Sequence, residues 1–120
     1  MTLLDLRAEG QALAATFGPM PDLNDDERAA AIDTWRGRMV NEHISSRVFA
    51  ALVPQLMRAG MDSARIEAVA VMIGDELRHG RQCAAMVEAL GGEALAPYPS
   101  LSEVPEHSDA PPLEALLRNV

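Results

Sequence analysis

The chain has 120 residues, a formal net charge of −8 at pH 7 and a sequence pI near 4.7. This excess of acidic side chains argues against nucleic acid and against an anionic membrane surface as partners. A single cysteine excludes an internal disulfide, no apolar run is long enough to span a bilayer, and early charged residues interrupt any signal-peptide core, so the sequence predicts a soluble, cytoplasmic protein.

Residues 2–17 are predicted to form a short amphipathic helix, because leucines at positions 3, 4, 6 and 13 alternate with alanines and charged residues. The helix should end at residues 18–21, which read Gly-Pro-Met-Pro and disfavour helix. Residues 1–21 therefore form a first segment, an N-terminal helix followed by a breaker.

A second helix is predicted from residue 25 to about residue 59, capped by Asn24 or Asp25. Pro54 lacks a backbone donor, so we expect a kink or an early end near residues 50–54. Every third or fourth position forms an apolar seam that one glutamate interrupts: Ile32, Trp35, Met39, Glu42, Ser46, Phe49, Val53 and Leu56.

A third helix is predicted over residues 63–90, with Gly60 suited to the end of the preceding helix and Asp62 or Ser63 to the N-cap. His79 lies on the shoulder of its apolar seam. That seam also contains one ionisable residue, Glu76: Ile66, Val69, Ile73, Glu76, Gly80, Cys83, Val87 and Leu90.

The short turn around Gly60 predicts that these two helices run antiparallel, as a hairpin within residues 22–92. With the turn centred after Gly60, Glu42 faces His79 directly. At about 1.5 Å of rise per residue, Glu42 is offset from Glu76 by only roughly 4.5 Å. Three potential metal ligands thus reach one level of one seam.

The remaining residues, 93–120, are predicted to hold a connector and the start of a further helix. Five prolines among Ser, Glu and Asp indicate an extended connector rather than a core element. A helical pattern resumes over residues 113–120, with Pro112 well placed at its first position.

A carboxylate in an apolar seam costs several kcal/mol unless it is paired, and a cation held jointly with an imidazole is one such partner. Glu76 and His79 supply that pair as Glu-x-x-His. The bland alternative is a buried ion pair without metal. The longer string at positions 75–79, DELRH, has a chance expectation on the order of one in a thousand from this composition, which favours the metal site.

The string at 75–79 resembles the D-E-x-R-H motif of the oxygen-activating di-iron carboxylate proteins of the ferritin-like superfamily. The resemblance covers about residues 25–92, two of the four bundle helices. It implies an all-α fold, in which the antiparallel hairpin forms half of a ferritin-like four-helix bundle. It also implies that Glu42 is a terminal ligand, Glu76 a bridging carboxylate and His79 the imidazole ligand of one iron.

By the same resemblance, Asp75 and Arg78 would orient a histidine across the bundle. A second glutamate and a second Glu-x-x-His are missing from the chain. A second copy of the chain could supply them around a two-fold axis, as in short-chain encapsulated ferritins, or they belong to the remaining half of a longer chain. We favour the longer chain, because a long connector followed by an apolar helical start is typical of a bundle crossover.

Two iron ions per completed site are expected, with manganese possible, since carboxylate oxygens and imidazole suit Fe(II) or Mn(II). The resemblance implies O2-dependent oxidation by an oxidase or oxygenase, in preference to an iron-oxidising or iron-storage protein. The alternative from another class is a metal-free helical hairpin that serves as an assembly module. Iron content after anaerobic reconstitution would separate the two.

Four other residues could take part in metal or electron chemistry, but each has a simpler interpretation. Cys83 is one turn from His79, and a free cysteine on an apolar seam is expected to be a core residue. Trp35 at seam spacing is expected to pack rather than to relay electrons. His43 and His107 are predicted to be solvated.

Overall fold

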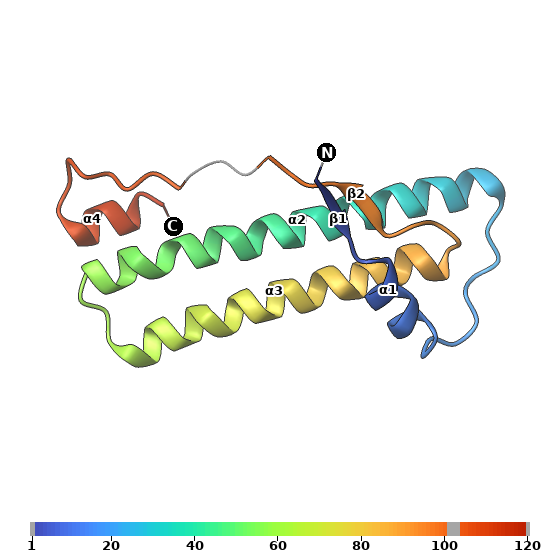
Figure 1. The fold of residues 1–120 in the computed structure, drawn as a ribbon, viewed down its shortest axis with the longest axis horizontal. Helices are drawn as coiled ribbons and strands as arrows, with labels where there is room; N and C mark the ends of the chain where they lie inside the picture. Colours follow the sequence, from blue (N-terminus) through green and yellow to red (C-terminus); the bar gives the residue numbers. More distant parts are fainter. Residues whose placement is uncertain (1, 101–103, 120) are drawn as a thin grey trace.

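The structure is a computed structural model that describes residues 2–100 and 104–119. Antiparallel α2 and α3 run along the length of a molecule of 55 × 28 × 23 Å (Figure 1). The predicted helical hairpin is therefore confirmed. In chain order, the described residues form β1 (Leu3–Asp5), α1 (Arg7–Ala14), α2 (Asp25–Arg58), α3 (Ser63–Ala89), β2 (Leu95–Pro97) and α4 (Pro112–Leu117).

Helix α2 begins with a capping box. The Asn24 side chain accepts a hydrogen bond from the Glu27 backbone N–H at 2.8 Å, and the Glu27 carboxylate accepts one from the Asn24 N–H at 3.1 Å. The helix continues through Pro54 to Arg58, so of the two expectations for this region the early end is wrong and the kink stays a prediction. Burial of Leu52 and Leu56 on either side of Pro54 offsets the one hydrogen bond that the proline removes.

The turn between the long helices follows the predicted chemistry. Gly60 has a positive φ of 73°, the left-handed conformation that glycine adopts at low cost. Asp62 caps α3 by accepting a hydrogen bond from the Arg65 N–H at 2.9 Å. At the other end of α3, Gly91 has a φ of 90° and ends the helix. None of the helices in the described ranges is long and apolar enough to cross a membrane.

The single helix expected over residues 2–17 is wrong at both ends, because residues 3–5 form β1 and α1 spans only Arg7–Ala14. The Asp5 carboxylate accepts a hydrogen bond from the Arg7 N–H at 3.1 Å, which starts the helix there. β1 pairs antiparallel with β2, with Leu4 opposite Ala96. The fold is thus mostly helical, with a two-stranded ribbon added.

The sequence predicted an extended connector that lies outside the core. In the structure, the first part of the connector belongs to the core. Ala94 and Ala96 are buried with Leu4 against α2 and α3. The connector then returns along α2 to the hairpin turn, where α4 begins at Pro112 as expected (Figure 1). Residues 101–103 of the connector and residue 120 of the expected last helix lie outside the described residues.

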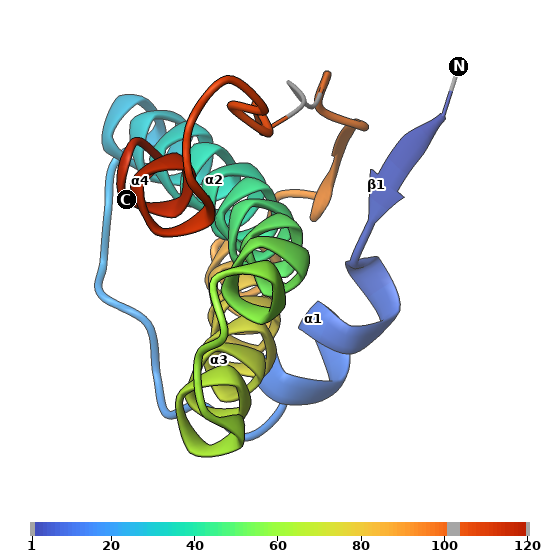
Figure 2. The same cartoon turned by 90° about the vertical axis from the view of Figure 1, so that its left-hand side faces the viewer.

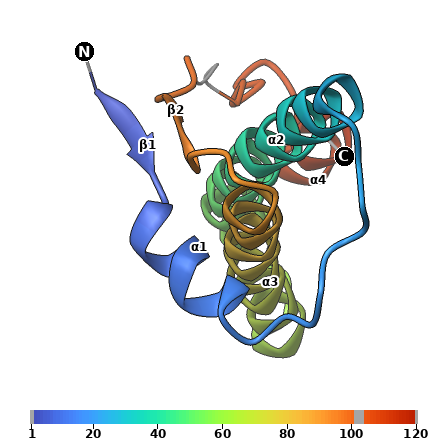
Figure 3. The same cartoon turned by 90° about the vertical axis from the view of Figure 1, so that its right-hand side faces the viewer.

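Views along the hairpin show α1 beside α3, and α4 beside α2 (Figures 2 and 3). The core has two parts. One lies near the ribbon and contains Met39 and Val87, both fully buried. The other lies near the hairpin turn, where Leu116 of α4 packs with Leu52 and Leu56 of α2. The candidate site lies between them.

Candidate metal centre

Glu42, Glu76 and His79 meet in space as the sequence predicted. Glu42 comes from the middle of α2, and Glu76 and His79 from successive turns of α3. His79 Nδ1 lies 3.7 Å from a Glu42 carboxylate oxygen and 3.9 Å from a Glu76 oxygen. One ligand atom from each residue can be chosen so that all three lie within 4.8 Å of one another.

The two distances from His79 are longer than direct hydrogen bonds and match two ligands of one cation. A hydrogen bond of this type spans about 2.7–3.2 Å. Two ligands of one ion, each about 2.1 Å from it, stand at most about 4.2 Å apart. The contacts from His79 to Glu42 and Glu76 fall inside this limit. Two carboxylates and one imidazole are hard oxygen and nitrogen donors, which fit Fe(II) or Mn(II).

The three side chains lie on a partly open face of the hairpin. Their exposed fractions are 21% for Glu76, 31% for Glu42 and 44% for His79. Gly80, the residue after His79, is buried where α3 faces α2, and a Cβ there would make ordinary contacts of 3.8 Å with the Glu42 Cβ and the Met39 carbonyl. The cluster therefore lies against the packed helices on one side and is accessible to solvent on the other.

The electrostatics show that the acids are crowded. The pKa of Glu76 is raised above its ordinary value, first because its carboxyl group shares a hydrogen bond with Glu42, then by burial and by the Glu42 charge. The nearby His79 acts in the opposite direction. A divalent cation between the two carboxylates would relieve this repulsion.

Asp75 and Arg78 form an ion pair of 3.0 Å with each other on the outer side of α3, and both are exposed. The motif thus separates into inward Glu76 and His79 and an outward pair. Orientation of a histidine across the bundle by Asp75 and Arg78 stays a prediction, because it requires a partner half.

A groove of about 470 Å³ opens beside the cluster. Arg38 places its guanidinium carbon 4.9 Å from the centre of the Trp35 ring. Cys83 is buried at the base, and burial raises the pKa of its thiol, which confirms its prediction as a core residue. The groove is lined by Glu42 and His79 of the cluster and by side chains of α1, its following turn, α2 and α3, among them Leu13, Phe17, Trp35 and Met86.

This groove is not predicted by the sequence. The apolar pattern of the N-terminal segment indicated that Leu13 and Phe17 cover something, but not which face. The close packing of Gly10 against α3 decides it, since a Cβ on Gly10 would lie 2.9 Å from the Ala84 carbonyl oxygen. That contact sets α1 against α3 and directs the following residues over the groove.

The two remaining histidines are half-buried, so they are only partly solvated, and each has a polar partner that was not predicted. His43 Nε2 lies 2.6 Å from the Tyr98 hydroxyl, and the two rings make an edge contact. His107 Nε2 lies 3.0 Å from the Asn119 side-chain oxygen. Neither partner could be predicted from a local pattern, because Tyr98 and Asn119 both come from the segment after α3.

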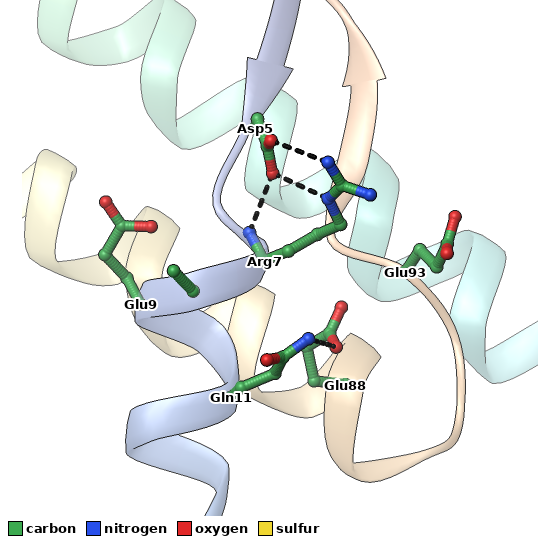
Figure 4. A pocket seen from close by; sticks show the side chains of 7 residues that line it. Asp5, Arg7, Glu9, Gln11, Glu88 and Glu93 are labelled. Atoms are coloured by element: carbon green, nitrogen blue, oxygen red, sulfur yellow. Dashed lines mark hydrogen bonds and ion pairs between the residues drawn. The ribbon is translucent and has the colours of Figure 1, made fainter.

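A second hollow, of about 520 Å³, lies between α1 and the start of β2 (Figure 4). Three of its charged side chains, those of Asp5, Arg7 and Glu88, make hydrogen bonds within the fold. Arg7 donates two hydrogen bonds of 2.9 Å to Asp5. Glu88 accepts hydrogen bonds from Gln11 at 3.0 Å and from the Ala94 N–H at 2.6 Å. This cluster fastens α1 and the ribbon to α3, which is a structural role.

The fold and the cluster together define a helical hairpin with a carboxylate and histidine site on its seam. Comparison with family models, with curated proteins and with solved structures found no match for the chain.

Proposed function

We propose that the chain is half of a ferritin-like bundle and that Glu42, Glu76 and His79 form half of a di-iron site for O2-dependent oxidation. The observation that carries this proposal is the convergence of two acids and one imidazole, from two helices, within 4.8 Å on an open face. Iron would supply the electrons for O2 reduction. Glu42 and Glu76 would hold the ions and His79 would complete the ligand set.

The position of α4 supports a second half that lies on the same face. Leu116 of α4 packs near Phe49 and Val69. These lie seven residues from Glu42 and from Glu76, and a shift of seven residues returns to the same side of a helix. The open face of the cluster therefore continues directly into a surface that already accepts an apolar helix.

Helix α4 runs opposite to α2, from the hairpin turn towards the middle of the molecule (Figure 1). Because Leu116 already packs near Phe49 and Val69, a helix that continued in this direction would run towards the level of the cluster. This supports completion of the site within a longer chain. A second copy around a two-fold axis is the other route, and it would supply the same four carboxylates and two imidazoles.

The test is an anaerobic titration with Fe(II) and with Mn(II), followed by calorimetry and by sedimentation. Three ligands leave an ion incompletely coordinated, so we expect tight binding only by an assembled species, together with self-association of this 120-residue chain. Metal should also raise the melting temperature of the folded protein by mass action. Tight stoichiometric binding by a monomer would contradict the half-site.

Matched variants locate the metal. Glu76→Leu and His79→Ala should abolish binding and O2 consumption, whereas Glu67→Leu and His43→Ala should not. Glu67 is exposed on the opposite side of α3, nine residues from Glu76. If neither metal changes the melting temperature of folded, associated protein, the metal site is contradicted. The metal-free assembly module would then be the function.

A further inference from the structure

The groove beside the cluster is built entirely by this chain and opens directly on the proposed metal ligands. Its volume of about 470 Å³ lies in the range of sites for small organic molecules. Its walls are apolar and aromatic. They are formed by the N-terminal segment through Leu13 and Phe17, by α2 through Trp35 and by α3 through Met86, with Glu42 and His79 at one edge.

Arg38 supplies the positive charge of this groove. Its guanidinium lies over the face of Trp35, at 4.9 Å from the ring centre. A stacked guanidinium keeps the N–H groups at its edge available, and two of them match the two oxygens of a carboxylate. Within the described part of the chain, Arg38 has no hydrogen bond or ion pair that would occupy those donors.

We propose that the groove binds an organic monocarboxylate with an apolar or aromatic body. The body lies among Phe17, Trp35 and Met86, and the carboxylate binds Arg38. A neutral apolar molecule would leave the Arg38 donors unused, and at the Arg38 end of the groove the guanidinium charge favours an anion over a cation. The other edge of the groove is the metal cluster, so the molecule is held beside it. Its role as the oxidised substrate rests on the proposed function, whereas its binding does not.

Trp35 makes the binding directly measurable, because it is the one tryptophan of the chain. The metal-free protein is titrated with 4-phenylbutyrate and with its neutral amide, and Trp35 fluorescence is recorded. We expect a saturable change with the acid and binding of the amide that is roughly ten-fold weaker or more, since hydrogen bonds to charged groups are worth more than neutral ones.

Variants test the assignment of Arg38. Arg38→Gln should bring the acid and the amide to similar affinity, Arg38→Lys should keep part of the preference, and Arg65→Gln, at the far end of α3, should behave as wild type. Phe17→Ala should weaken both probes alike. Far-UV circular dichroism checks that each variant remains folded.

Mn(II) separates this proposal from the metal site. Bound Mn(II) should speed the proton relaxation of bound 4-phenylbutyrate in wild type. In Glu76→Leu that effect should vanish while the fluorescence response persists. A fluorescence response without any Mn(II) effect in assembled wild type would contradict the proposed function and would leave the carboxylate site supported.

Equal binding of acid and amide, or an unchanged preference in Arg38→Gln, would overturn the proposal. Trp35 fluorescence that is unchanged by both probes but changes with protein concentration would also overturn the proposal, because a second copy would then fill the groove.

Discussion

The hairpin seam has two regions that differ sharply although the same two helices form both. Near the ribbon, Met39 and Val87 are fully buried, and Leu4 of β1 covers the core there. A turn away, Glu42 and His79 are 31% and 44% exposed. The chain covers its apolar seam with its own ribbon and leaves the acidic stretch open. The open stretch is therefore where a ligand or a partner can bind.

The largest effect should come from the closed region. Met39→Ala removes a fully buried side chain and should lower the free energy of unfolding by about 2–5 kcal/mol, measured by denaturant titration. Met72→Ala is the control, since Met72 is 46% exposed on the face of α3 near Glu76, and it should change stability by less than about 0.5 kcal/mol. Equal losses in the two variants would mean that the regions are not different.

The next effect concerns the contact that sets α1 against α3. Gly10→Ala places a methyl group 2.9 Å from the Ala84 carbonyl oxygen, so α1 must shift, at a cost of about 1–3 kcal/mol. The control is Gly37→Ala in α2, where a Cβ meets nothing within 4 Å and should add about 0.5–1 kcal/mol of stability. Thermal unfolding of both variants checks the pair. Gly10→Ala should also weaken 4-phenylbutyrate binding, because Leu13 and Phe17 move with α1.

In the open region a substitution should act in the opposite direction. Glu76→Leu removes crowded charge, so the metal-free protein should be equally stable or more stable, by up to about 1 kcal/mol, while metal binding is lost. Glu67→Leu should leave metal binding intact. A clear loss of stability in Glu76→Leu would mean that the carboxylate is an ordinary structural residue.

The same group predicts a pH dependence. The pKa of Glu76 is raised above 4.5, mainly by its hydrogen bond with Glu42, so the native state holds this proton more tightly than the unfolded chain. The resulting stability is present below pH 4.5 and is lost as the pH rises through the raised pKa. Metal-free wild type should therefore lose stability relative to Glu76→Gln across that window. A difference that stays flat with pH would contradict the pairing of the two acids.

The smallest effect on stability is expected at the outward pair. Arg78→Ala breaks an exposed ion pair and should cost less than about 0.5 kcal/mol, as should Arg65→Ala with its partner Asp62. If Asp75 and Arg78 orient a histidine across an assembled bundle, Arg78→Ala should lower metal affinity about 10- to 100-fold, and Arg65→Ala should not. Calorimetry on the assembled species distinguishes the two.

The long helices and the cluster could be predicted because they depend on local rules. Asn24, Gly60 and Asp62 mark helix ends through caps and turn geometry that a few neighbouring residues determine. The level match of Glu42 with His79 then follows from the rise of a helix and the position of one short turn. The prediction of this level match depends only on residues 24–79.

The ribbon and the groove depend on contacts between distant segments, and local patterns do not encode these. β1 and β2 have three residues each, too few to show a repeating pattern. Leu3 and Leu4 suited a helix as well as a strand, and pairing with Pro97 and Ala96 decided between them. The groove beside Arg38 and Trp35 likewise depends on the close approach of α1 to α3 at Gly10.

The pairing of β1 with β2 also has a consequence for how the chain is made and opened. Leu3 pairs with Pro97, so the first strand must wait for more than ninety later residues to leave the ribosome. The α2 and α3 hairpin closes over one short turn and needs no such delay, and contacts that are close in sequence generally form first. The N-terminal strand and α1 therefore attach last. Amide hydrogen exchange should show them detaching first, which would uncover the groove while the metal ligands stay in place.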